Sequence, residues 1–78
     1  MTNVIEYTCQ CFNRDNDITY GIECDTYEEA KNKVDHYRKL IADNGEVDQH
    51  SHIEVSKDIV NSEGDVLDHK VLNIYSIE

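Results

Sequence analysis

Apolar and polar residues alternate near the start of the chain. From Val4 to Phe12 the alternate positions that begin with Ile5 are apolar, aromatic or cysteine, and polar residues stand between them. A period of two is typical of a strand with one buried face. Residues 13–17 have no apolar side chain and are rich in turn formers, and the alternation resumes from Ile18 to Cys24. The two segments therefore predict an antiparallel hairpin, with Ile18 on the same face as Cys24.

The period lengthens to three and four residues between Thr26 and Asn44, where one amphipathic helix is predicted. Thr26, followed three residues later by Glu29, has the form of a capping box, and Asn44-Gly45 favours the left-handed conformation that ends many helices. The apolar stripe consists of Tyr27, Ala30, Val34, Tyr37, Leu40 and Ile41.

Two more strands are predicted after the helix. From Ser51 to Asn61 the apolar residues again share one face, with Lys57 as an interruption. Residues 61–65 form a turn, and the last strand runs from Val66 to Ile77. This strand is apolar on both faces, which fits a central strand, a strand whose outer face meets another chain, or a strand with a β-bulge.

The order ββαββ predicts an α+β fold, with a four-stranded, mainly antiparallel sheet and one helix on one face. A chain of 78 residues is too short to fill two cores, so residues 1–78 are expected to form a single domain. There is no run of 18 apolar residues and no signal peptide, and three cysteines cannot all pair. We therefore expect a cytoplasmic protein with reduced thiols.

Charge limits the possible partners. The chain has 17 acidic and 7 basic residues and a net charge of −10, so it should repel nucleic acid and anionic membranes. The predicted helix is close to neutral, whereas the strands and loops are acidic. The strand pattern places several carboxylates on the sheet face opposite the helix and others around its rim. The predicted partner-binding residues are Glu6, Glu23, Asp43, Glu46, Asp48, Glu54, Asp58, Glu63, Asp65 and Asp68.

Carboxylates on such a face stand about 4.8 to 6.6 Å apart, a spacing of the same order as the charge spacing along DNA. The sequence thus favours a DNA mimic, although acidity can also serve solubility alone. Ten unbalanced charges exceed the roughly 2 to 8 that solubility needs in a small domain. Phe12, Leu72 and Ile74 are the apolar residues expected to be exposed and to add specificity.

In size, charge and compactness the whole chain resembles the small acidic phage-encoded inhibitors that imitate nucleic acid, although no motif matches. The resemblance implies a host-takeover protein that blocks the basic nucleic-acid-binding site of a nucleoid-associated protein, RNA polymerase or a defence nuclease. An immunity protein or antitoxin against a basic nuclease is an alternative, and so is a homodimeric assembly module joined through the last strand.

Two short pairs could suggest metal chemistry. Cys9 and Cys11, and likewise His50 and His52, are separated by one residue, whereas zinc ligands are usually two to four residues apart. Each pair should share a strand face, and buried thiols pack as small hydrophobes more often than they bind metal. No phosphate-binding loop or nucleophile motif occurs. We therefore expect no metal, no cofactor and no enzymatic activity.

Overall fold

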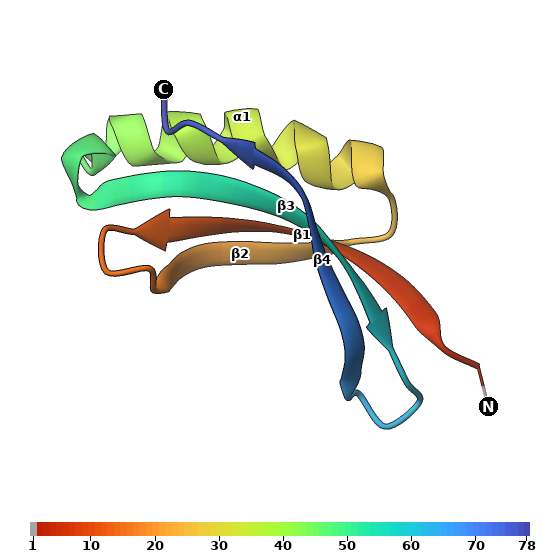
Figure 1. The fold of residues 1–78 in the computed structure, drawn as a ribbon. Helices are drawn as coiled ribbons and strands as arrows, with labels where there is room; N and C mark the ends of the chain where they lie inside the picture. Colours follow the sequence, from red (N-terminus) through yellow and green to blue (C-terminus); the bar gives the residue numbers. More distant parts are fainter. Residues whose placement is uncertain (1) are drawn as a thin grey trace.

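A computed structural model describes residues 2–78; Met1, part of the predicted domain, lies outside the described residues. The described chain forms four antiparallel strands in the order β2-β1-β3-β4, with α1 packed against one face of the sheet (Figure 1). This confirms the predicted α+β fold and its ββαββ order. The elements are β1 (Val4–Asn13), β2 (Ile18–Cys24), α1 (Tyr27–Asp43), the short 3₁₀ turn η1 (Val47–Gln49), β3 (His50–Val60) and β4 (Val66–Tyr75).

Both ends of α1 follow the prediction. Thr26 is the N-cap, and its hydroxyl oxygen accepts the backbone N–H of Glu29 at 3.2 Å. At the other end Gly45 has a φ of 68°, which is in the left-handed region. The N–H of Gly45 donates to Ala42 O and that of Glu46 to Ile41 O, which is the Schellman arrangement.

The core lies between α1 and the middle of the sheet. Cys9 and Cys11 of β1 stand opposite Val55 and Ile53 of β3, and all four side chains are fully buried. This confirms the faces predicted for these two strands. From α1 the buried residues are Ala30, Val34, Tyr37 and Ile41.

The helix covers only part of the sheet. One end of the sheet projects beyond α1 and bends away from it (Figure 1). It consists of the start of β1, the end of β3, the start of β4 and the β3–β4 turn. We call this projection the arm, and it comprises residues 2–6 and 58–69. It gives the molecule its elongated shape of 45 × 25 × 18 Å. Because no helix covers the arm, Val4, Ile5, Val66 and Leu67 are about half exposed.

The last strand has an edge position in the sheet, so the interpretation as a central strand is wrong. Its register against β3 shifts between Val55 and Ser56 and again between Ile59 and Val60. These irregularities confirm the predicted bulge and explain apolar residues on both faces, because each shift changes the face that the following residues occupy. Whether a second chain contacts this strand stays a prediction.

A third irregularity lies between Cys11 and Phe12 of β1, where the pairing with β2 shifts. Ile18 consequently stands opposite Phe12 and is 55% exposed, instead of sharing the buried face of Cys24 as predicted. Among the described residues no helix combines the length and the apolarity that crossing a bilayer requires.

Candidate functional site

The sheet face opposite α1 is the candidate site, and we call it the open face. Strand pairing defines it, because residues directly opposite each other on neighbouring strands share a face. Glu6 stands opposite Asp58, Gln10 opposite Gly21 and Glu54, and Thr8 opposite Glu23 and Ser56. The face also carries Val4, Phe12, Ile18, His52, Val60, Val66, His69, Val71 and Ile74.

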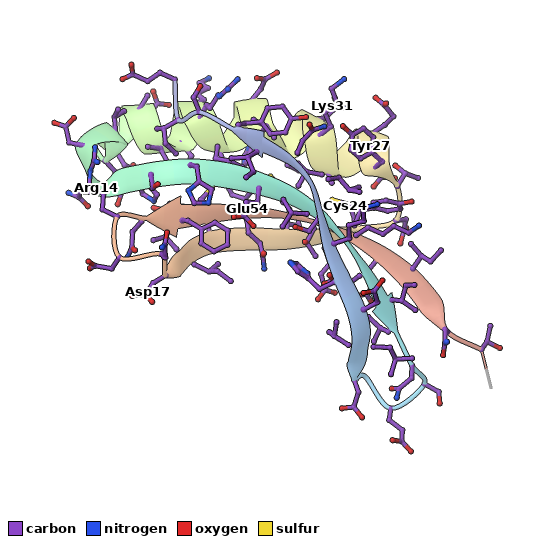
Figure 2. All side chains as sticks on the ribbon, viewed as in Figure 1. Arg14, Asp17, Cys24, Tyr27, Lys31 and Glu54 are labelled. Atoms are coloured by element: carbon purple, nitrogen blue, oxygen red, sulfur yellow. The ribbon has the colours of Figure 1, made fainter. Side chains whose placement is uncertain are left out.

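Charges are segregated between the two sides of the molecule. Glu6, Glu23, Glu54 and Asp58 lie on the open face, which has no lysine or arginine within residues 2–78. Figure 2 shows the contrast between Glu54 on β3 and Lys31, which projects from α1 away from the sheet. The described basic residues are Lys31, Lys33, Arg38 and Lys39 on α1, Lys57 and Lys70 on the α1 side of the sheet, and Arg14 in the β1–β2 turn.

The remaining predicted carboxylates are not on the open face. Asp43 is the last residue of α1 and Asp48 lies in η1. Glu46 lies between these two elements, where it accepts a hydrogen bond from the Tyr20 hydroxyl at 2.6 Å.

Glu63 and Asp65 are in the turn at the tip of the arm. Asp68 stands opposite Ile59 and so lies on the α1 side, because the bulges in β4 change its register. The structure therefore gathers part of the predicted set on one face and distributes the rest along the molecule.

Histidines hold two of the open-face carboxylates. His52 Nε2 donates to Glu54 Oε2 at 2.8 Å, and His69 Nδ1 donates to Asp58 Oδ1. Phe12 stacks on the His52 ring with a centroid distance of 4.9 Å. Neither pairing was expected from the sequence. A histidine two residues before Glu54 on a strand was a usable signal, whereas the pairing of His69 with Asp58 depends on the register of β4.

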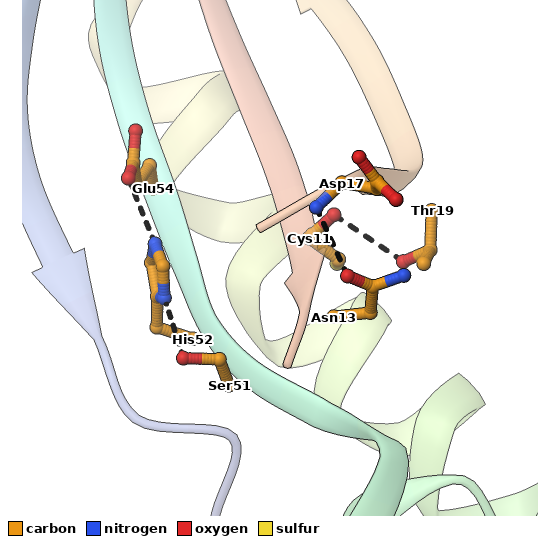
Figure 3. A network of polar contacts seen from close by, with 7 residues as sticks. All are labelled: Cys11, Asn13, Asp17, Thr19, Ser51, His52 and Glu54. Carbon is orange, nitrogen blue, oxygen red and sulfur yellow. Dashed lines mark hydrogen bonds and ion pairs between the residues drawn. The ribbon is translucent and has the colours of Figure 1, made fainter. Parts of the chain in front are cut away.

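Ser51, His52 and Glu54 form a chain of hydrogen bonds (Figure 3). Ser51 Oγ is 2.9 Å from His52 Nδ1, so the order of groups is that of a nucleophile, a base and a carboxylate. The attachment is reversed relative to serine hydrolases, where the carboxylate holds Nδ1 and the serine contacts Nε2. None of these three residues lines either of the two cavities described below. These contacts hold the His52 ring in its stacked position against Phe12.

Two hydroxyl groups are buried on the open face. Thr8 is 5% exposed and Ser56 is fully buried, and they stand directly opposite each other on β1 and β3. Their oxygens have no hydrogen-bond partner within residues 2–78. Beside them is a cavity of about 480 Å³, lined by Thr8, Gln10, Gly21, Ile22, Glu23 and Asp58.

A second cavity of about 320 Å³ lies at the opposite end, beside the β1–β2 turn and η1. Its wall includes His50, which is buried, stacks on Tyr20 and contacts Thr19 Oγ1 through Nε2 at 2.7 Å. His50 Nδ1 donates to the Glu46 carbonyl at 2.9 Å. Through these contacts His50 connects Glu46, the residue before η1, to Thr19 and Tyr20 of β2.

The cysteine and histidine pairs do not converge. Burial raises the pKa of Cys9 to about 11 and that of Cys11 to about 12, so both thiols are protonated at neutral pH. His50 is packed with Tyr20 and His52 with Phe12, so the expected common face of the two histidines is wrong. The register shift between Phe12 and Asn13 separates them. Within residues 2–78 no group of three or more histidine, cysteine, aspartate or glutamate side chains could hold a metal ion.

The chemistry of the open face must be interpreted from its own residues, because no protein-family model, no curated protein and no solved structure matches this chain.

Proposed function

We propose that the protein is a cytoplasmic binding module whose open face docks on the basic nucleic-acid-binding site of another protein and excludes nucleic acid from it. The observation that carries this proposal is the segregation of charge. Within the described residues the open face has carboxylates and no lysine or arginine, whereas the α1 side carries both signs. Complementary charge accelerates association and selects the partner.

The arrangement of the carboxylates suits a surface that binds phosphates. Glu6 and Asp58 are direct neighbours across β1 and β3, and Glu23 is one strand further on, beside Thr8. Neighbouring strands are about 4.8 Å apart, so several lysine or arginine side chains can each meet a carboxylate. A phosphate backbone offers such a groove the same kind of contact, so the two ligands compete.

Apolar groups beside the charges would supply specificity. Ile74 is 65% exposed and stands opposite Glu54, and Phe12 stacks on His52 nearby. Leu72 is half-buried at the second bulge of β4, between Val71 and Asn73. Large apolar side chains at the centre of an interface commonly contribute most of the binding energy.

The test compares two double variants that have the same net charge. Glu6→Gln with Glu23→Gln neutralises the open face, and Glu28→Gln with Asp35→Asn neutralises exposed carboxylates of α1. The immobilised full chain is incubated with the DNA-cellulose-binding proteins of a bacterial lysate, at low and high salt. We expect capture of a basic DNA-binding protein that added salt or duplex DNA releases.

We expect the open-face pair to weaken capture by at least about tenfold and the α1 pair to change it by less than about twofold. Equal losses from both pairs would show that net charge, and not the open face, controls binding. Capture that duplex DNA does not reverse would refute competition with nucleic acid. A captured nuclease toxin would favour the immunity-protein alternative, which relies on the same electrostatics.

A homodimeric assembly module is the second candidate, and the edge position of β4 favours it. This strand exposes Val66, Leu67 and Ile74 beside an unpaired backbone edge, which is a common template for pairing with a second chain. A two-fold dimer through β4 would lengthen the acidic surface. Sedimentation velocity across a range of concentrations tests this, and Leu67→Lys should shift the chain towards monomer. A concentration-independent monomer would exclude the dimer.

A further inference from the structure

The cavity of about 480 Å³ beside Thr8, on the open face, has a lining that favours one class of ligand. We propose that it receives the side chain of an arginine from the partner protein, as the anchor of the interface proposed above. This inference rests on the proposed function and deepens it. It names one pocket and one type of side chain where the proposed function names only a charged surface.

The charge of the lining selects a cation. Glu23 of β2 and Asp58 of β3 line the cavity, and the lining includes no lysine or arginine. One oxygen of Asp58 already accepts a hydrogen bond from His69, so an incoming cation would use its other oxygen. Glu6 stands next to Asp58 on the neighbouring strand and adds a third carboxylate at the margin. Carboxylates on neighbouring strands repel each other, so a cation placed between them is stabilised.

A buried hydroxyl provides a second, independent indication of a ligand. Thr8 lines the cavity, is 5% exposed, and its hydroxyl oxygen has no partner among residues 2–78. Buried polar groups in native proteins are nearly always hydrogen-bonded, and those that are not call for an unseen water or ligand. The Thr8 oxygen itself has less than 1 Å² of accessible surface, so an N–H donor in the cavity would reach it only after the side chain turns towards the cavity.

The number and positions of the acceptors favour arginine over lysine. Gln10, Glu23 and Asp58 line the cavity from β1, β2 and β3, and each of these side chains carries an acceptor oxygen. A guanidinium group presents five N–H donors in a fixed plane, whereas an ammonium presents three around a point. The wider fork can reach acceptors on several walls at once.

Gly21 keeps the cavity open. A Cβ atom built on Gly21 would lie 3.4 Å from Gln10 Cγ and 3.8 Å from Cys9 O, so a small side chain fits without a clash. Gly21 is not among the residues with positive φ. Gly21→Val therefore narrows the cavity while leaving the charge and the strand conformation unchanged. Ala42→Leu, at an exposed position of α1, adds the same number of carbon atoms and serves as the control.

The experiment titrates the full chain with three short capped peptides and follows backbone amide shifts by NMR. The peptides are Gly-Arg-Gly, Gly-Lys-Gly, and the same sequence with citrulline, which keeps the shape of arginine without its charge. We expect the arginine peptide to shift the amides of Thr8, Gln10 and Gly21 in a saturable way. Gly21→Val should weaken its binding by at least about tenfold, and Ala42→Leu should leave it unchanged.

Several results would overturn the proposal. The first is equal binding of the lysine or citrulline peptide. The second is a set of amide shifts spread over acidic residues outside the cavity. The third is undiminished binding of the arginine peptide to the Gly21→Val variant. The outcome is separate from that of the proposed function, because the peptides need no partner protein. If Gly21→Val still captures a DNA-binding protein while Glu6→Gln with Glu23→Gln does not, the acidic face is functional and the arginine pocket is wrong. If the arginine peptide binds in the cavity but no DNA-binding protein is captured, the proposed function fails instead.

Discussion

Replacing Thr8 with valine should make the protein more stable, although the change removes a polar group from a native side chain. The Thr8 oxygen is buried and has no hydrogen-bond partner within residues 2–78. A buried hydroxyl in that state costs about 1 to 3 kcal/mol. Valine has nearly the same shape and suits a strand, so Thr8→Val should recover at least about 1 kcal/mol. In a domain of this size the gain corresponds to a rise in Tm of about 4 to 8 °C.

Urea unfolding followed by circular dichroism measures this change, and an unaltered m-value would show that it arises in the folded state. Thr19→Val is the matched control, because the Thr19 hydroxyl contacts His50 Nε2 at 2.7 Å and Cys11 O at 3.2 Å. The same chemical change there should lower the free energy of unfolding by about 1 to 3 kcal/mol.

Substitution of Ser56 provides the measurement that could refute the interpretation of the Thr8 hydroxyl as unsatisfied. Ser56 stands directly opposite Thr8 and is also unpartnered, so Ser56→Ala should be stabilising too, and the two effects should add. If the two hydroxyls form a hydrogen bond with each other in solution, each single variant would leave the other hydroxyl without a partner and destabilise the fold. The double variant would then restore stability. Such a double-mutant cycle would contradict the interpretation of both groups as unsatisfied.

Further predictions concern the ends of α1 and the buried thiols. Thr26→Ala removes the N-cap acceptor of Glu29 N–H and should lower the free energy of unfolding by about 1 kcal/mol in urea titrations; no change would mean that the cap is not formed. Gly45→Ala forces a Cβ into a backbone with a φ of 68° and should cost about 1 to 2 kcal/mol by the same assay; a neutral effect would contradict the left-handed C-terminal turn. Because burial raises the pKa of Cys9 and Cys11 above the usual 9.0, the unfolded chain ionises first. The contribution of these two thiols to stability should therefore be constant just below pH 9 and fall as the pH rises towards 11 and 12, as measured by urea midpoints; a flat profile above pH 9 would contradict thiol burial.

Periodicity alone predicted the elements that carry the core. The repeat of apolar residues in α1 and the alternation in β1 and β3 gave the correct buried faces, because regular elements keep a constant relation between sequence position and direction. The helix ends were also predicted, since Thr26 and Gly45 have local chemistry that acts without the rest of the fold.

Features that depend on pairing between distant segments could not be predicted. A bulge moves the following residues to the other face, and neither glycine nor proline marks the shifts that displace Ile18 and Asp68. The pairing of His69 with Asp58 requires the register of β4 against β3. Part of the predicted acidic set therefore occupies one surface, and the remainder follows the loops.

The short reach of α1 divides the molecule into regions that should open independently. Amides under the helix are protected by the core and should exchange with solvent deuterium only when the whole domain unfolds. Amides of the arm are held mainly by strand hydrogen bonds and should exchange through smaller, local openings. A partner that binds to the arm would suppress those local openings. Slower exchange at residues 2–6 and 58–69 in the presence of the partner would therefore map the surface that it covers.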